Sequence, residues 1–374
     1  MYPTNLNYKM PAEWVKHSRT YIAWPVQASM CYPEDFEAVC LGYIEIIRAI
    51  AEFEPVTVVC NPVDSEKLPC LFPKDRIELL CIDHNDAWLR DNGPTFLIHE
   101  TGEVVGVNWQ FNAWGGKYAP WDLDNQVAPR ILDSVGLKRF DAPLVMEGGS
   151  FHVDGEGTLL TTAECLLNSN RNPELTREQI EAELKKFLNI QKVVWLKNGL
   201  DGDETDGHVD NICCFAAPGK ILLQVCDDPE DANYAITQEN LKILNEETDA
   251  SGRKFEIFPI LQPPKLFNKE KRLTLSYLNF YFVNGGLILP VFGGQARETD
   301  RLAAQVLGEL FPERRIRTVN GLAIIREGGN VHCITQQMPA VQKSEAGSLN
   351  SESWRGNREK RNSSCYSDEL FKQH

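Results

Sequence analysis

A motif that occurs twice in this 374-residue chain constrains its fold more than any other feature. Residues Glu147–His152 have the sequence Glu-Gly-Gly-Ser-Phe-His, and residues Glu327–His332 have the sequence Glu-Gly-Gly-Asn-Val-His. Agreement in the pattern Glu-Gly-Gly-small polar-apolar-His indicates a duplicated structural module. Cys333 follows the second copy, whereas Val153 takes that place in the first. The repeat therefore predicts related modules, of which one carries a cysteine nucleophile.

Apolar periodicity predicts a helix followed by a strand at five places along the chain. In the first, Asp35–Phe53 has apolar residues at a helical spacing of about 3.6, and Val56–Cys60 is an apolar run of strand type. Thr176 starts the third helix with a capping-box signature, because Gln179 follows three residues later. The other predicted helices are residues 125–134, 176–187, 231–248 and 299–311, and the strands after them are residues 143–146, 192–196, 254–259 and 315–319.

The strands of this series begin about 50 to 85 residues apart, which is too far for single βαβ steps. We therefore expect small α/β modules of several strands each, whose functional ends point to a shared centre. The polar clusters Asp86–Pro94 and Glu204–Asp210 agree with this fold, because each follows a predicted strand. The rival fold, a doubly wound parallel sheet, predicts a phosphate-binding loop after an early strand. The sequence has neither a Gly-x-Gly-x-x-Gly nor a Walker-type stretch.

The end of the chain differs in composition from the rest. No linker divides residues 1–340, so we expect them to form one catalytic domain. Residues 341–374 are rich in Ser, Asn, Glu, Lys and Arg, and we expect a disordered, dispensable tail. No stretch approaches the roughly 20 apolar residues of a membrane helix. The start, Met1–Asn5, lacks the basic and apolar regions of a signal peptide, so we expect no membrane association.

Charge and cysteine content limit the class of protein. The net charge of −15 argues against a nucleic-acid partner, which would need a basic face. It suits a cationic substrate, although many cytosolic enzymes are equally acidic for solubility. The 11 cysteines are odd in number and include no Cys-x-x-Cys pair, which disfavours a disulfide framework or a zinc site. We therefore expect a cytoplasmic protein.

Cysteine, histidine and carboxylates that are distant in sequence are the components of a thiol-dependent active site. Here they occur as Cys333, His208 and the acidic residues of the two polar clusters. A free cysteine is more often a small buried hydrophobe, and a lone histidine is more often a satisfied polar residue. The motif around each residue is what favours a catalytic role.

In these motifs the chain resembles the agmatine deiminases of the guanidine-modifying (pentein) superfamily, over about residues 8–340. The resemblance implies a five-bladed α/β propeller of ββαβ-type modules. It also implies hydrolysis of agmatine to N-carbamoylputrescine and ammonia, without metal or organic cofactor, by a homo-oligomer. Two residues depart from the family pattern, namely Glu327 in place of a third glycine and Asp206 in place of a frequent Asn. The shared motifs are Met10–Trp14, Asn85–Pro94, Phe111–Gly116, Glu147–Gly155, Cys165–Leu167, Asn170–Pro173, Gly207–Asp210 and Asn330–Gln337.

The resemblance also implies a role for each catalytic residue. Cys333 attacks the guanidinium carbon as a thiolate, helped by the positive charge of the bound substrate. Asp91 and Asp210 hold the guanidinium nitrogens in charge-assisted hydrogen bonds. His208 protonates the departing ammonia and then deprotonates the water that cleaves the covalent intermediate. Glu147 accepts a hydrogen bond from His208, with Glu327 as the alternative partner.

Other residues of the motifs are expected to bind substrate or to support the site. Trp88 packs on the guanidinium and the methylene chain, where a cation–π contact contributes about 0.5–2 kcal/mol. Trp114 either lines the same pocket or belongs to the core. Glu204 meets the distal amine of agmatine. His332 would point away from the nucleophile if the segment were a strand, so we expect a structural role for it.

Several functions share this chemistry. An arginine or peptidylarginine deiminase and an amidinotransferase are the enzymatic alternatives, and a non-catalytic guanidine-binding protein is the alternative from another class. Free arginine would need a cationic residue for its carboxylate, and no such residue is identifiable in the sequence. Agmatine hydrolysis is therefore the function that we expect.

Overall fold

The computed structural model describes residues 1–29, 35–72, 75–326 and 328–341. Glu327, the alternative partner of His208, and residues 342–374 of the expected tail lie outside the described residues. Of the described helices, none is both long and apolar enough to pass through a membrane.

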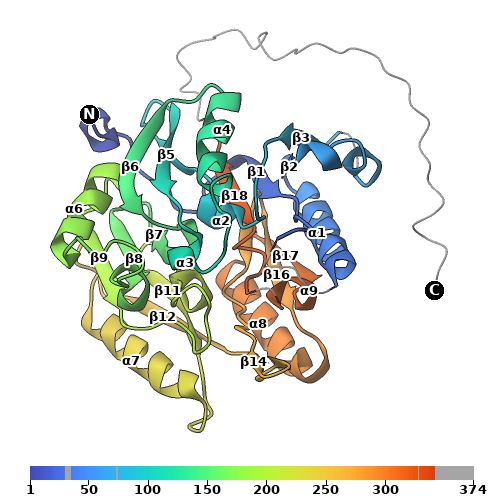
Figure 1. Ribbon diagram of the computed structural model, residues 1–374. Helices are drawn as coiled ribbons and strands as arrows, with labels where there is room; N and C mark the ends of the chain where they lie inside the picture. The colour runs from blue at the N-terminus through green and yellow to red at the C-terminus, as the bar shows by residue number, and fades with distance from the viewer. Residues whose placement is uncertain (30–34, 73–74, 327, 342–374) are drawn as a thin grey trace.

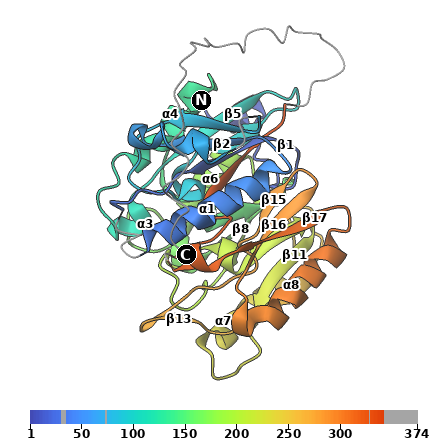
Figure 2. The same ribbon diagram turned by 90° about the vertical axis from the view of Figure 1, so that its right-hand side faces the viewer.

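The described chain repeats one arrangement five times. In each repeat, an antiparallel pair of strands is followed by a helix and by a strand that lies parallel to the second. The five sheets have the strand orders β18-β1-β2-β3, β4-β5-β6, β7-β8-β9, β10-β11-β12 and β15-β16-β17. Figures 1 and 2 show the five long helices at the periphery of the molecule. This order agrees with the ββαβ modules that the resemblance implies, and it differs from a single doubly wound sheet.

The bounds of the elements are as follows. The strands are β1 (His17–Ala23), β2 (Val56–Cys60), β3 (Ile77–Cys81), β4 (Thr95–Ile98), β5 (Val104–Gln110), β6 (Arg139–Val145), β7 (Phe151–Val153), β8 (Thr158–Thr162), β9 (Lys192–Leu196), β10 (Cys213–Ala217), β11 (Lys220–Val225), β12 (Glu256–Leu261), β13 (Phe267–Asn268), β14 (Lys271–Arg272), β15 (Tyr281–Val283), β16 (Gly286–Val291), β17 (Arg315–Asn320) and β18 (Thr335–Pro339). The long helices are α1 (Phe36–Ala51), α4 (Val127–Ser134), α6 (Arg177–Leu188), α7 (Ala232–Glu246) and α8 (Arg297–Leu310). The one-turn helices are α2 (Leu89–Asn92), α3 (Ala113–Gly116), α5 (Ala163–Leu166) and α9 (Leu322–Ile325).

The predicted recurrence of a helix and a following strand is confirmed at all five places. Helix α1 buries the face that carries Tyr43, Ile46 and Ile50, and the predicted capping box of Thr176 and Gln179 is present at the start of α6. Most of the antiparallel strands were not predicted. Strand β8, for example, is buried at every position, and a strand covered on both faces shows no alternation of apolar and polar residues.

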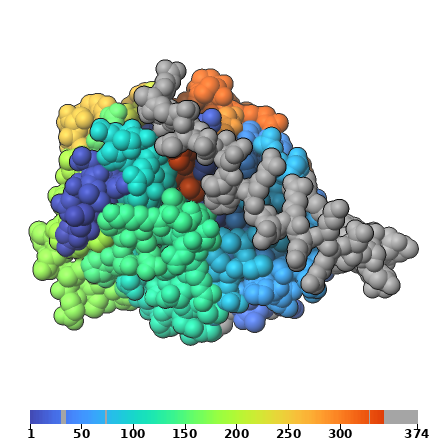
Figure 3. All heavy atoms as spheres, turned by 90° about the horizontal axis from the view of Figure 1, so that it is seen from above, coloured from blue at the N-terminus to red at the C-terminus, as the bar shows by residue number. Residues whose placement is uncertain are grey.

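The two ends of the described chain meet in the first sheet. Strand β18 pairs antiparallel with β1, so the last strand of the fold completes the first unit. The segment just before β18, which contains Cys333, is thereby drawn into the middle of the molecule. Seen from above, the molecule is hollowed there, and segments coloured for the end of the fold lie within the hollow (Figure 3).

Candidate active site

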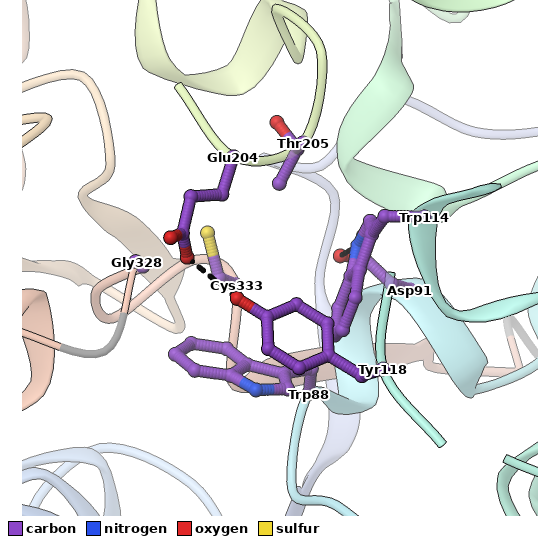
Figure 4. A pocket seen from close by; sticks show the side chains of 9 residues that line it. Trp88, Asp91, Trp114, Tyr118, Glu204, Thr205, Gly328 and Cys333 are labelled. Carbon is purple, nitrogen blue, oxygen red and sulfur yellow. Dashed lines mark hydrogen bonds between the residues drawn. The ribbon is translucent and has the colours of Figure 1, made fainter. Parts of the chain in front are cut away.

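A pocket at this centre is lined by five of the eight site residues that were predicted from the sequence. The pocket encloses about 340 Å³ of space, part of which is open to solvent. Figure 4 shows the rings of Trp88, Trp114 and Tyr118 around it, with Asp91 and the sulfur of Cys333. The other three predicted residues, His208, Glu147 and Asp210, are buried next to it. The residues that line the pocket are Trp88, Asp91, Trp114, Tyr118, Glu204, Thr205, Gly328, Gly329 and Cys333.

Cys333 lies in a turn over residues 331–334, not in a strand, and its side chain is only 4% exposed. The amide Nδ2 of Asn279 donates to its Sγ at 3.1 Å, and the Sγ donates to Oδ2 of Asp210 at 3.4 Å. Burial raises the pKa of Cys333 well above its usual value, and Asp210 and Asp91 raise it further. Cys333 is therefore a thiol when the pocket holds no cation.

The second glycine of each copy of the duplicated motif makes room for this site. A Cβ on Gly149 would lie 2.7 Å from Nδ1 of His208, 2.9 Å from Oδ2 of Asp210 and 3.0 Å from Oδ1 of Asp91. A Cβ on Gly329 would lie 2.5 Å from the ring of Trp88 and 3.1 Å from Sγ of Cys333. Only glycine permits such close approach of backbone and functional groups.

His208 is fully buried between two carboxylates. Its Nδ1 lies 3.9 Å from Oδ1 of Asp91, and its Nε2 lies 3.7 Å from Oε2 of Glu147. These are ion-pair distances and are longer than hydrogen bonds, so the expected hydrogen bond to Glu147 is not formed in this structure. Burial lowers the pKa of His208, but Asp91, Cys165 and Glu147 outweigh it and raise the pKa well above its usual value. The imidazole is therefore protonated and can donate a proton.

Arg171 forms a salt bridge with Glu147, and the motif that contains Arg171 had predicted no role for it. Its Nε donates to Oε1 of Glu147 at 2.6 Å, and both side chains are fully buried. Burial raises the pKa of Glu147, but His208 and Arg171 together bring it below the usual value. The motif Asn170–Pro173 was visible in the sequence, but a salt bridge to a residue 24 positions away was not.

Glu147, His208 and Cys165 are also the only described residues whose His, Cys and carboxylate ligand atoms gather closely enough for a metal ion. Their three ligand atoms lie within 4.8 Å of one another, and all three side chains are buried. A cation bound there would occupy the imidazole and prevent it from transferring protons.

Asp91, at the end of α2, accepts hydrogen bonds on both oxygens. The backbone N–H of Gly149 donates to Oδ1 at 2.9 Å, and Nε1 of Trp114 donates to Oδ2 at 2.9 Å. Burial raises the pKa of Asp91 to about 6, even though His208 and Trp114 lower it. Trp114 itself has φ 55° and ψ 44°, a strained conformation for a residue with a Cβ. Both alternatives for Trp114 thus apply, because it is buried and also lines the pocket.

Asp210 is bound on one oxygen and free on the other. Nδ1 of His332 contacts Oδ2 at 2.9 Å, and Nδ2 of Asn279 donates to the same oxygen at 3.4 Å. Among the described residues, Oδ1 has no hydrogen-bond partner although it is buried. The premise that His332 belongs to a strand was wrong, since residues 331–334 form a turn. His332 does not line the pocket, and its ring contacts Asp210.

Glu204 lies at the rim of the pocket and is already engaged. The hydroxyl of Tyr118 donates to its Oε2 at 2.8 Å, as Figure 4 shows, and Nζ of Lys271 lies 2.6 Å from its Oε1. Lys271 belongs to the short β13–β14 hairpin and is partly exposed. A cationic ligand that reached Glu204 would therefore compete with Lys271.

The chain is similar to proteins of known family. The family described as Porphyromonas-type peptidyl-arginine deiminase matches residues 9–339. An agmatine deiminase of Pseudomonas syringae pv. tomato is 43% identical over 363 residues, which cover 90% of this chain and 96% of the relative. The solved agmatine deiminase of Enterococcus faecalis has a TM-score of 0.87 at 35% identity, covering 91% of this chain and 98% of the other. The agmatine deiminase of C. jejuni, solved with substrate bound, has a TM-score of 0.81 at 30% identity, covering 90% and 97%.

The environment of Cys333 predicts how its thiol reacts. We expect iodoacetamide to label the exposed Cys70 and Cys81 first and Cys333 slowly, because burial and the neighbouring carboxylates disfavour its thiolate. Asp210→Asn removes one of these charges and should accelerate the labelling of Cys333 several-fold. Peptide mass spectrometry measures each site, and Cys70 serves as the internal control. An unchanged or slower rate at Cys333 in the folded variant would contradict this account of the thiol.

Proposed function

The chain belongs to the Porphyromonas-type peptidyl-arginine deiminase family, and we propose that it hydrolyses agmatine to N-carbamoylputrescine and ammonia. Agmatine deiminases at 43–44% identity over most of the chain, and solved agmatine deiminases with the same fold, support this substrate. We also propose, from the sequence and the resemblance, that the protein acts in the cytoplasm as a homo-oligomer.

One observation carries the proposed chemistry. The thiol of Cys333 and the carboxylate of Asp91 line one space. The imidazolium of His208 and the carboxylate of Asp210 are buried beside these two groups. No Lys, Arg or His is found among the described residues that line the pocket. A guanidinium placed there would pair with Asp91 and with the free Oδ1 of Asp210. The rings of Trp88 and Trp114 would then lie against its methylene chain.

The proposed reaction has two stages. Binding of the guanidinium lowers the pKa of Cys333, whose proton leaves to water, and the thiolate attacks the guanidinium carbon. The C–N bond breaks as His208 gives its proton to the leaving ammonia, and an amidino group remains on the sulfur. His208 then takes a proton from water, the hydroxide adds to the same carbon, and the C–S bond breaks. The urea group of the product forms as the added hydroxyl loses its proton.

Within this reaction, Asp91 and Asp210 orient the carbon toward the sulfur. Glu147, held by Arg171, maintains the charge of His208 before the ammonia leaves. Glu204 is positioned to receive the distal amine of agmatine once Lys271 is displaced. Free arginine would instead bring a carboxylate toward Glu204, which favours agmatine over arginine.

Ammonia release tests the proposed function directly. We expect turnover with agmatine, little with free arginine or an arginine peptide, and a loss of at least about 10³-fold in Cys333→Ala. Mass spectrometry of protein quenched during turnover should find an amidino adduct on Cys333. Cys214→Ala is a matched control, since Cys214 is equally buried and does not line the pocket. Full turnover by Cys333→Ala would overturn the mechanism, and preference for an arginine peptide would overturn the substrate.

The pKa of Asp91 predicts the acid limb of the pH profile. Only the deprotonated carboxylate pairs with the guanidinium, so kcat/KM should fall about tenfold per pH unit below about pH 6. Trp114→Phe removes an N–H donor that lowers this pKa, so the limb should move to higher pH. Trp109→Phe is the control, because it removes a buried hydrogen bond from Nε1 to Thr95, and neither residue lines the pocket. A limb that does not move in Trp114→Phe would exclude Asp91 as its origin.

The ion pair at the pocket rim predicts a change in KM. Lys271→Ala frees Glu204 and should lower the KM for agmatine by up to about fivefold, the range of an exposed ion pair, with kcat unchanged. Glu204→Gln should raise the KM. Lys220→Ala, which breaks a surface ion pair elsewhere, should change neither constant. If Lys271→Ala left the KM unaltered, competition between Lys271 and the distal amine would be ruled out.

A further inference from the structure

Beneath the pocket lies a buried charged cluster that the proposed reaction does not use. Its centre is Glu13, in the segment before β1, which is 3% exposed. Nη1 of Arg90 donates to Oε1 of Glu13 at 3.3 Å, Nε2 of His332 contacts both carboxylate oxygens at 3.0 and 3.1 Å, and Nε2 of His152 lies 3.5 Å from Oε2. The side chains of this cluster are all at least nine-tenths buried.

The cluster gives a physical reason for the duplicated motif. His152 and His332 are the last residues of its two copies, and both direct Nε2 to the same carboxylate. The two modules thus meet at Glu13 through equivalent histidines. The difference between the copies is on the other side of the ring, where Nδ1 of His332 reaches Oδ2 of Asp210.

His332 lies between two carboxylates, which sets its protonation. Ionised carboxylates accept hydrogen bonds and donate none, so both ring nitrogens must carry protons to satisfy Glu13 and Asp210 together. Burial and Arg90 lower the pKa of His332, but Glu13 and Asp210 raise it above the usual value. The two carboxylates are then balanced by the guanidinium of Arg90 and the imidazolium.

The chain of contacts ends on the groups that would receive the substrate. His332 occupies Oδ2 of Asp210, so rotation of the carboxylate is opposed and Oδ1 stays free. A second path runs through Arg90, whose Nε donates to the carbonyl of His332 at 3.3 Å and whose backbone N–H donates to the carbonyl of Cys333 at 3.1 Å. Glu13 therefore contacts Arg90, whose backbone N–H binds the carbonyl of Cys333. It also contacts His332, which binds the carboxylate of Asp210.

We propose that Glu13 is a positioning residue of the reaction: its carboxylate keeps His332 doubly protonated, and His332 thereby fixes Asp210 with Oδ1 free for the guanidinium. The inference rests on the proposed function, since it assigns a role in guanidine binding. Residues that orient the groups touching a reacting centre commonly change activity 10–100-fold when they are altered, and an effect of about this size is expected for Glu13→Gln.

The matched control is Glu54→Gln. Glu54 is 1% exposed and accepts from Nδ1 of His17 at 2.9 Å, so the same substitution removes a buried charge beside a buried histidine. It has no contact with His332 or Asp210 among the described residues. Glu13→Gln should lower kcat/KM for agmatine about 10–100-fold, and Glu54→Gln should change it by less than about threefold. The double variant Glu13→Gln/His332→Gln should lose less than the product of the two single losses, because Glu13 orients Asp210 through the His332 ring.

Nitrogen NMR of protein labelled at its seven histidines provides a readout that a merely structural role would not move. The His332 signals, assigned with His332→Gln, should show both ring nitrogens protonated at pH 8 in the wild type and in Glu54→Gln. Glu13→Gln should show a neutral ring. A neutral His332 ring in the wild type would by itself overturn the inference. Additive losses of kcat/KM in the double variant would also overturn it, as would equal losses in Glu13→Gln and Glu54→Gln. Absence of agmatine turnover by the wild type would instead refute the proposed function.

Discussion

Carboxylates buried away from water determine much of this structure, because each one must have a compensating charge or remain costly. Removing a carboxylate from water has an effective cost of several kcal/mol, and a cation close by offsets much of it. Glu147 has Arg171 and Glu13 has Arg90, and in both pairs the side chains are almost fully buried. Neither partner could be placed in the centre without the other.

Asp91 is the carboxylate whose negative charge is compensated only in part. Its pKa is raised to about 6, and the imidazolium of His208 lies 3.9 Å away and is shared with Glu147. Asp210 is compensated on one oxygen by His332, and its other oxygen has no partner among the described residues. The centre thus has an excess of negative charge next to the pocket, which Asp91 lines. A guanidinium would complete the charge balance, and the same balance accounts for a nucleophile that is a thiol until the cation arrives.

The close packing of this centre depends on two glycines, because a Cβ at either position would collide with neighbouring side chains. Gly149 and Gly329 occupy equivalent positions in the two copies of the duplicated motif, and each lets catalytic groups approach to about the distance of contact. The histidines of the same copies meet on Glu13. Both copies of the motif therefore contribute backbone to the same centre, and only the second copy is followed by a cysteine.

The sequence by itself determined the α/β class and the five recurrences of a helix and a following strand, and the resemblance of its motifs to a known family indicated eight residues of the centre. These features rest on local periodicity and on motifs that are continuous in the chain. Most of the antiparallel strands were missed, because strands such as β8 are buried on both faces and show no alternation. Only the tertiary structure decided that His208 lies at ion-pair distance from Glu147, that Asn279 contacts the sulfur, and that Glu13 joins His152 to His332. Those contacts join residues 54 to 319 positions apart, and such pairings are set by how the units pack, which no local pattern encodes.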